Sequence, residues 1–224
     1  YIINSFYDSE KDIINRPSKT ALDSLVTQRT KLKFYFFFNT LALVLSSFVS
    51  YRATAFMVFY AFLIWVYSHK LKRVTFIGNI LASILAVFPF FAIFLYYGNI
   101  SLMIFLHATF LYLLILIREL LKDLLSYRGD LIYEYQTIPV RYGIIWSKRI
   151  ISLLILLCLI PGYILTTFHE VGSMKLYFYA SLGVLGVLLI GVWNMKGLKW
   201  YLFQYNIIKF LIVAGVFSIV LISY

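Results

Sequence analysis

The sequence has little charge and almost no cysteine. Charged residues make up 13% of its 224 residues, and nine Asp and Glu residues stand against 20 Lys and Arg residues. A soluble domain has about 25% charged residues, so this composition excludes a soluble globular protein. Cys158 is the single cysteine and lies inside an apolar run, so the chain cannot form an intramolecular disulfide bond.

Long apolar runs take up most of the chain, in which 62% of the residues are hydrophobic. A helix needs about 20 mainly apolar residues to cross a bilayer, and several segments come close to that length. These segments are Phe34–Val49, Ala53–Tyr67, Ile77–Tyr97, Ser101–Leu121, Ile150–Phe168, Leu176–Trp193 and Tyr205–Ser223. The pattern predicts an all-α, multi-span transmembrane helical bundle with these segments as its full spans, and the apolar start of the chain predicts the end of another span.

The Lys and Arg residues are unevenly distributed between the predicted loops. Alternate loops, beginning with the segment before Phe34, carry nearly all of them, whereas the intervening loops carry almost none. Loops that stay in the cytoplasm have such an excess of Lys and Arg, so the basic loops are predicted to be cytoplasmic. Membrane topology thus accounts for the net charge of +11, and no nucleic acid partner is expected.

Most of the acidic residues fall in two short windows on the predicted cytoplasmic side. In the first, NSFYDSEKD, the side chains of Asn4, Asp8 and Asp12 are four residues apart and share one face of a helix. Oxygen ligands suit a hard cation such as Mg²⁺, which takes water and phosphate oxygens as its other ligands. The alternative is a solvated helix end whose charges pair with those one turn away.

The second window, RELLKDLLSYRGD, repeats this arrangement. Its polar residues at spacings of 4, 3 and 4 share one helix face; they are Glu119, Asp123, Ser126 and Asp130. The Lys and Arg residues between them would balance the charge of a bound polyanion. Together the two windows predict a site for a metal-bound phosphate compound at the membrane surface.

Three motifs resemble those of the UbiA superfamily of intramembrane prenyltransferases. NSFYDSEKDIINRP resembles the first aspartate-rich motif of that family, NDxxDxxxDxxNxP, and KDLLSYRGD followed by QTIPVRYG resembles the second. Between them, YSHKLKRVTFIGN is similar to the YSxxLKRxxxxGN loop of the family. The motifs occur in the family's order, and the resemblance covers essentially the whole chain. It implies a nine-helix fold, of which residues 1–224 would form a single integral membrane prenyltransferase-like domain without helix one and most of helix two.

The resemblance also implies a reaction and the residues that perform it. The expected activity is Mg²⁺-dependent transfer, within the membrane, of a polyprenyl group from an allylic polyprenyl diphosphate to a hydrophobic acceptor that is a lipid or an aromatic compound. The expected metal ligands are Asn4, Asp8 and Asp12 for one Mg²⁺ ion and Asp123 and Asp130 for the other, and the four aspartates are the expected catalytic residues. The expected diphosphate contacts are Arg16, Tyr67, Lys72, Asn79 and Lys122. The expected location is a bacterial or archaeal cell membrane, with the active site on the cytoplasmic side.

Two positions depart from the family's motifs. Ser5 stands where an Asp usually follows Asn4, and Ser126 replaces the middle acid of the second motif. Glu119, one turn before Asp123 on the same face, is a candidate to supply the missing carboxylate. The alternative is a catalytically impaired UbiA-like protein that binds a prenyl lipid or diphosphate without turnover. A transporter or channel is disfavoured because the predicted spans are almost free of charge.

Overall fold

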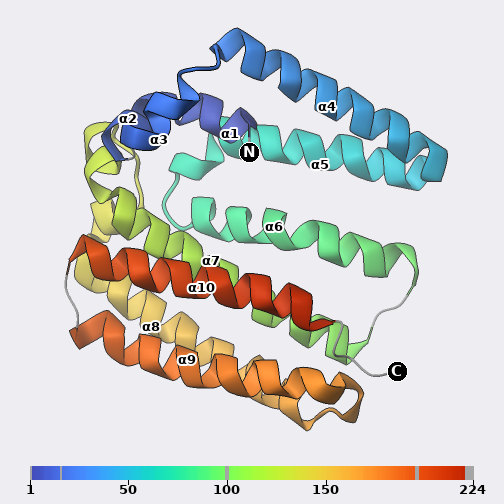
Figure 1. The fold of residues 1–224 in the computed structure, drawn as a ribbon, viewed down its shortest axis with the longest axis vertical. Coiled ribbons are helices and arrows are strands. Elements are labelled where there is room, and N and C mark those ends of the chain that lie inside the picture. Colours follow the sequence, from blue (N-terminus) through green and yellow to red (C-terminus); the bar gives the residue numbers. More distant parts are fainter. Residues whose placement is uncertain (1, 16, 99–100, 195–196, 220–224) are drawn as a thin grey trace.

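The computed structural model describes residues 2–15, 17–98, 101–194 and 197–219, and every regular element within these ranges is a helix (Figure 1). Seven helices in the described ranges are long and apolar enough to cross a membrane. They are α4 (Gln28–Val49), α5 (Tyr51–His69), α6 (Ile77–Tyr96), α7 (Leu102–Ile132), α8 (Ile138–Thr167), α9 (Lys175–Asn194) and α10 (Leu198–Ser218). The prediction of an all-α, multi-span membrane bundle is confirmed.

The remaining elements are short and lie between or before these spans. They are α1 (Ile2–Tyr7), α2 (Ser9–Asn15), α3 (Pro17–Asp23), η1 (Leu71–Arg73) and η2 (His169–Met174). Helices α4 and α5 are joined through the single residue Ser50, whose side chain accepts a hydrogen bond from the Ala53 backbone N–H at 3.1 Å. An N-cap of this kind satisfies one of the free donors at a helix start, so α5 begins immediately after α4 ends.

Several helices extend beyond the apolar runs from which they were predicted, and α7 and α8 extend the furthest; α4 and α10 begin at Gln28 and Leu198 instead of Phe34 and Tyr205. The predicted end of the last span, Ser223, lies outside the described residues. The predicted span Ser101–Leu121 continues as α7 to Ile132, and the predicted span Ile150–Phe168 begins as α8 at Ile138, with a non-helical kink at Gly143 (φ 85°, ψ 167°). Hydropathy places a boundary where charged residues begin, whereas the backbone of α7 remains helical through acidic residues that have polar partners. The additional turns of α7 carry most of the second acidic window, whose acids the fold buries instead of exposing to solvent.

Helix α7 lies at the centre of the bundle and packs against α6, α8 and α10 (Figure 1). Its buried side chains form the core with residues of α8, α9 and α10. The fully buried members include Leu114, Ile117, Ile151, Leu165, Leu185 and Ile208. Helix α4 instead lies at the periphery beside α5, and large apolar side chains such as Phe36, Phe37 and Phe48 are exposed on it. Such a surface is stable where lipid surrounds it.

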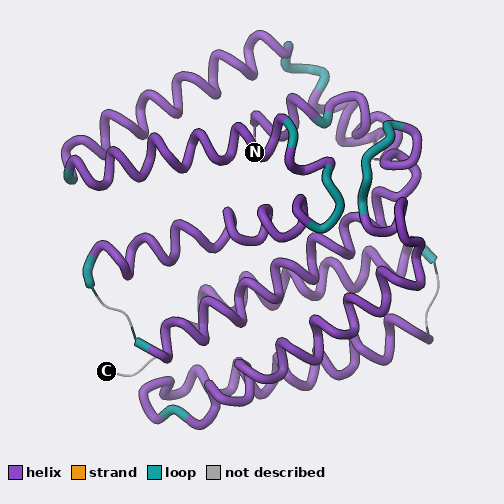
Figure 2. Tube along the Cα trace, turned by 180° about the vertical axis from the view of Figure 1, so that it is seen from behind, coloured by secondary structure: helices purple, strands orange, loops and turns teal. Residues whose placement is uncertain are grey.

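The short N-terminal helices gather at one end of the bundle, which we call the polar end. Helix α2 packs against α7, and α1 packs against α4 and α5 (Figure 1). Figure 2 shows the α5–α6 and α7–α8 connections beside each other at this end. They are joined by a hydrogen bond from the Gln136 backbone N–H to the Arg73 carbonyl oxygen at 3.1 Å and by one from the Thr75 hydroxyl to the Gln136 carbonyl oxygen. Both connections therefore help to fix the polar end.

Candidate active site

The first acidic window forms one continuous stripe, although α1 ends and α2 begins around Asp8. The backbone N–H of Asp8 donates to the Asn4 carbonyl oxygen at 3.0 Å, and that of Asp12 donates to the Asp8 carbonyl oxygen at 2.9 Å. Helical hydrogen bonding therefore continues through the break. Because residues four apart lie on the same helix face, Asn4, Asp8 and Asp12 are aligned as the sequence predicted.

Lys72 joins this stripe from the α5–α6 connection. Its Nζ lies 2.7 Å from Asp8 Oδ1 and 3.4 Å from Asn4 Oδ1. The Tyr135 hydroxyl donates to the same Asp8 oxygen at 3.3 Å. Burial lowers the pKa of Lys72, although the Asp8 carboxylate opposes that effect. Burial, and secondly Asp8, raise the pKa of Tyr135 to about 12, so this hydroxyl stays protonated at neutral pH and acts as a donor.

The second acidic window occupies the inward face of α7 near its end. Glu119, Asp123, Ser126 and Asp130 are all buried there. The Asn79 amide, from the first turn of α6, donates to Asp123 Oδ2 at 2.7 Å. Lys11 of α2 forms an ion pair with Asp130, whose side chain is fully buried. The shared face that the spacing predicted is therefore present, and partners from two other elements hold it.

The two windows meet in one site. The Lys11–Asp130 ion pair connects α2 to α7, and the Asn15 side-chain oxygen accepts a hydrogen bond from the Gly129 backbone N–H at 3.0 Å. Tyr67, near the end of α5, lies near both Asp8 of the first window and Asp123 of the second. Lys72 contacts Asp8 of the first window, and Asn79 donates a hydrogen bond to Asp123 of the second. Four of the five predicted diphosphate contacts, Tyr67, Lys72, Asn79 and Lys122, thus lie at the polar end, and Arg16 lies outside the described residues.

The side chains of the polar end fit a metal that is only partly held by protein. Within the described ranges, no three His, Cys, Asp or Glu side chains come together as a ready metal site. The donors are instead carboxylate and amide oxygens in two groups, each of which is paired with a lysine or an amide. Mg²⁺ usually takes one or two carboxylates and completes its coordination with water and substrate phosphate. The donor chemistry therefore suits Mg²⁺ that arrives with a phosphorylated ligand.

Sequence reasoning missed three residues of the site. Lys11 and Asn15 connect α2 to α7, and Tyr135 hydrogen-bonds to Asp8. Lys11 and Asn15 lie within the first motif, so their spacing from the acids was visible. Nothing in the sequence marks Tyr135, because its contact with Asp8 crosses 127 positions of the chain.

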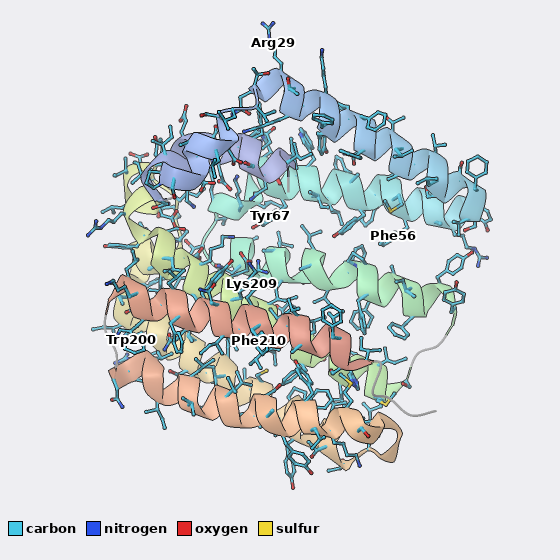
Figure 3. All side chains as sticks on the ribbon, in the orientation of Figure 1. Arg29, Phe56, Tyr67, Trp200, Lys209 and Phe210 are labelled. Carbon is cyan, nitrogen blue, oxygen red and sulfur yellow. The ribbon has the colours of Figure 1, made fainter. Side chains whose placement is uncertain are left out.

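A large apolar cavity lies toward the opposite end of the same helices. Its volume is about 1140 Å³, and its walls come from α4, α5, α6 and α7. Residues in its wall include Phe56, Ala92 and Tyr112, with Arg52 near the start of α5. Figure 3 labels Phe56 and Tyr67 on α5, and Tyr67 is the nearer of the two to the short N-terminal helices. The fold therefore combines a polar site at one end with an apolar cavity toward the other.

These features define an integral, multi-pass membrane protein with a charged site at one end of its bundle. Residues 1–201 match the UbiA prenyltransferase family. The chain belongs to that family, which confirms the resemblance found in the three motifs.

Individual relatives give the same result. The chain is 26% identical to the digeranylgeranylglyceryl phosphate synthase of Methanosphaera stadtmanae over 188 residues, covering 84% of this chain and 65% of the relative. It is 33% identical to the enzyme of the same name from Thermococcus gammatolerans over 142 residues, covering 63% of this chain and 51% of the relative. The chain thus spans between half and two thirds of the length of these curated relatives.

A solved structure from work on digeranylgeranylglyceryl phosphate synthase in membranes has a similar fold. The TM-score is 0.62 at 23% identity, with 97% of this chain and 77% of that chain covered.

Proposed function

We propose that this protein transfers a polyprenyl group from an allylic polyprenyl diphosphate to a lipid acceptor, at an Mg²⁺-dependent site on the cytoplasmic side of the membrane. The observation that carries the proposal is the meeting of both acidic windows at the polar end, through the ion pair of Lys11 with Asp130 and the hydrogen bond of Asn15 with Gly129. A diphosphate needs cations and metal-binding oxygens in one place, and family membership supplies the reaction class.

The residues of the polar end would hold and orient the diphosphate. Asn4, Asp8 and Asp12 on one side and Asp123 and Asp130 on the other would hold Mg²⁺, which neutralises diphosphate charge and so makes it a better leaving group. Lys72 and Lys122 would contact its oxygens as point charges, with Tyr67, Asn79 and Arg16 nearby. The bond between the allylic carbon and the diphosphate oxygen breaks, and its electron pair leaves with diphosphate. The carbon then bonds to a nucleophilic oxygen of the acceptor, which loses its proton.

The acceptor is proposed to be a glyceryl phosphate lipid. The relatives are named digeranylgeranylglyceryl phosphate synthases, a name that describes a glyceryl phosphate bearing two geranylgeranyl groups. The apolar cavity offers room for a long hydrocarbon chain whose charged end remains at the polar end. An aromatic acceptor is the alternative within the same reaction class.

A second candidate function is binding without turnover. It is favoured by Ser126, which lies buried on α7 between Asp123 and Asp130 where the family's motif has an acid. The site retains its other carboxylates, so we favour catalysis.

The test is to incubate the full-length protein, in nanodiscs, with radiolabelled geranylgeranyl diphosphate and a panel of glyceryl phosphate lipids and aromatic acceptors. We expect a prenylated glyceryl phosphate lipid that forms with Mg²⁺, disappears with excess EDTA and returns when Mg²⁺ is restored. Binding of the diphosphate with no product from any acceptor would favour the second candidate. Neither binding nor product would refute both.

A further inference from the structure

Glu119 occupies an unusual position for a carboxylate in a membrane-spanning helix. It lies one turn before Asp123 on α7, and its side chain is 6% exposed. Oε1 accepts a hydrogen bond from Arg118 Nη2 at 2.6 Å, and Oε2 accepts one from Lys122 Nζ at 2.5 Å. Both oxygens are therefore paired with cations, and the group of three carries one net positive charge.

This pairing determines where the Lys122 ammonium group lies. A lysine side chain has a flexible four-carbon stem, and an ion pair with a buried carboxylate restricts it to few conformations. Lys122 also lies near Tyr67 and directly precedes Asp123 on α7, and both of these residues belong to the polar end. Glu119 thus holds the cation beside the carboxylate that the proposed function gives to Mg²⁺.

We propose that Glu119 is a positioning residue, which orients Lys122 toward the diphosphate and does not itself bind the metal. This inference rests on the proposed function, in which Lys122 contacts the diphosphate. The sequence made Glu119 a candidate to replace the acid missing at Ser126. With Arg118 and Lys122 on its two oxygens, Glu119 instead has the contacts of a residue that acts through its neighbour.

The first test compares Glu119→Gln and Glu119→Asp with the unmodified full-length protein in nanodiscs. The glutamine keeps the size of the side chain and removes its charge, whereas the aspartate keeps the charge and withdraws it by one methylene group. Loss of a residue that orients a metal ligand costs about 10- to 100-fold, and a residue that orients a phosphate-binding lysine should have an effect of similar size. We expect the KM for the prenyl diphosphate to rise by roughly that factor in Glu119→Gln and by less in Glu119→Asp.

Other readouts separate this role from two alternatives. The acceptor KM and the Mg²⁺ concentration for half-maximal rate are expected to stay unchanged. A higher Mg²⁺ requirement in Glu119→Gln would identify Glu119 as a metal ligand and overturn the inference. A diphosphate KM that is unchanged in both variants would mean a purely structural role and would also overturn it. Glu10→Gln, which changes an exposed carboxylate of α2, is the matched control.

A double variant tests whether Glu119 acts through Lys122. Residues that work as a unit have non-additive effects. The double variant Glu119→Gln, Lys122→Met is therefore expected to have the same diphosphate KM as Lys122→Met alone. A KM increase in the double variant equal to the product of the two single increases would overturn the inference. If the unmodified protein transfers no prenyl group, the proposed function itself fails. If it is active but the Glu119 variants behave like Glu10→Gln, this inference alone fails.

Discussion

Two acids of the polar end, Asp8 and Asp130, form ion pairs in which both partners are largely withdrawn from solvent. The Asp8 and Lys72 side chains are 16% and 6% exposed, and those of Asp130 and Lys11 are 0% and 12% exposed. Breaking a buried pair by removing one partner costs about 3–5 kcal/mol, because the other charge remains buried and unpaired. An amide in place of the carboxylate leaves the lysine charge unpaired, but it keeps the shape of the side chain and one oxygen that accepts a hydrogen bond, so it is the mildest variant for testing function at these positions.

Asp8→Asn and Asp123→Asn are each expected to lower prenyl transfer by about 100-fold or more, the loss typical of removing a charge that stabilises a leaving group. Both variants should still insert into the membrane with unchanged helix content, because the apolar core of α7 to α10 is untouched. Product formation from labelled diphosphate and circular dichroism measure the two effects, with Glu10→Gln as the control. Near-normal turnover in either variant would exclude that aspartate from the metal site.

Among the elements, the contact of α2 with α7 brings the two acidic windows together. This contact is made at Gly129, where the absence of a side chain lets the Asn15 side chain reach the Gly129 backbone N–H. A Cβ atom added at Gly129 would lie 2.4 Å from Asn15 Nδ2, which is much closer than two such atoms can approach. Asn15 would have to turn away and lose its hydrogen bond. Glycine therefore leaves the space in which the Asn15 side chain reaches the backbone of α7.

Gly129→Ala is expected to lower kcat/KM about 10-fold, the loss of roughly one hydrogen bond at the site, by displacing α2 and Lys11 from α7. Alanine stabilises a helix by about 1 kcal/mol relative to glycine, so the variant is not expected to unfold at a lower temperature. A loss of activity at an unchanged unfolding temperature would therefore come from the altered contact between α2 and α7. Gly183→Ala in α9 is the matched control, because an added Cβ there meets no atom within 4 Å. Equal activity of the two variants would contradict the importance of this contact.

At the scale of the whole molecule, the bundle has a charged end and an apolar cavity toward the other end. Basic residues favour the cytoplasmic side, so the polar end is expected to face the cytoplasm. The wall of the cavity starts on α6 at Ile84, which lies about one and a half helical turns beyond Asn79. A ligand with a charged head and a long apolar tail matches this division.

Cysteine labelling tests the orientation. Leu25 and Tyr97 are 80% and 77% exposed and lie at opposite ends of the bundle, and the native Cys158 is fully buried. A membrane-impermeant maleimide should label Tyr97→Cys in right-side-out vesicles and Leu25→Cys only in inside-out vesicles. The reverse pattern would place the polar end outside the cell.

Filling the cavity tests whether it accommodates the prenyl chain. Ala92 lines the cavity, and Ala92→Phe is expected to lower turnover of geranylgeranyl diphosphate several-fold while sparing dimethylallyl diphosphate, which is too short to reach it. Ala180→Phe, on an exposed face of α9, is the control. An equal loss with both substrates would count against a prenyl chain in the cavity.

The sequence by itself determined the spans, the charge asymmetry and the two acidic stripes, because each depends only on local hydropathy or helical periodicity. Phe34–Val49 needed no tertiary information to be recognised as a span, and the spacing of Asn4, Asp8 and Asp12 was enough to align them. The same reasoning placed the end of α7 too early, since it treats a charged residue as solvent-exposed.

Only the tertiary structure decided which groups the acids contact. Lys11 pairs with Asp130, Tyr135 donates a hydrogen bond to Asp8, and Glu119 is paired with Arg118 and Lys122. The Lys11 and Tyr135 contacts join positions more than 100 residues apart, so no local pattern encodes them. The Glu119 pairs are local, but burial on the inner face of α7 makes them important, since an unpaired carboxylate is costly away from water.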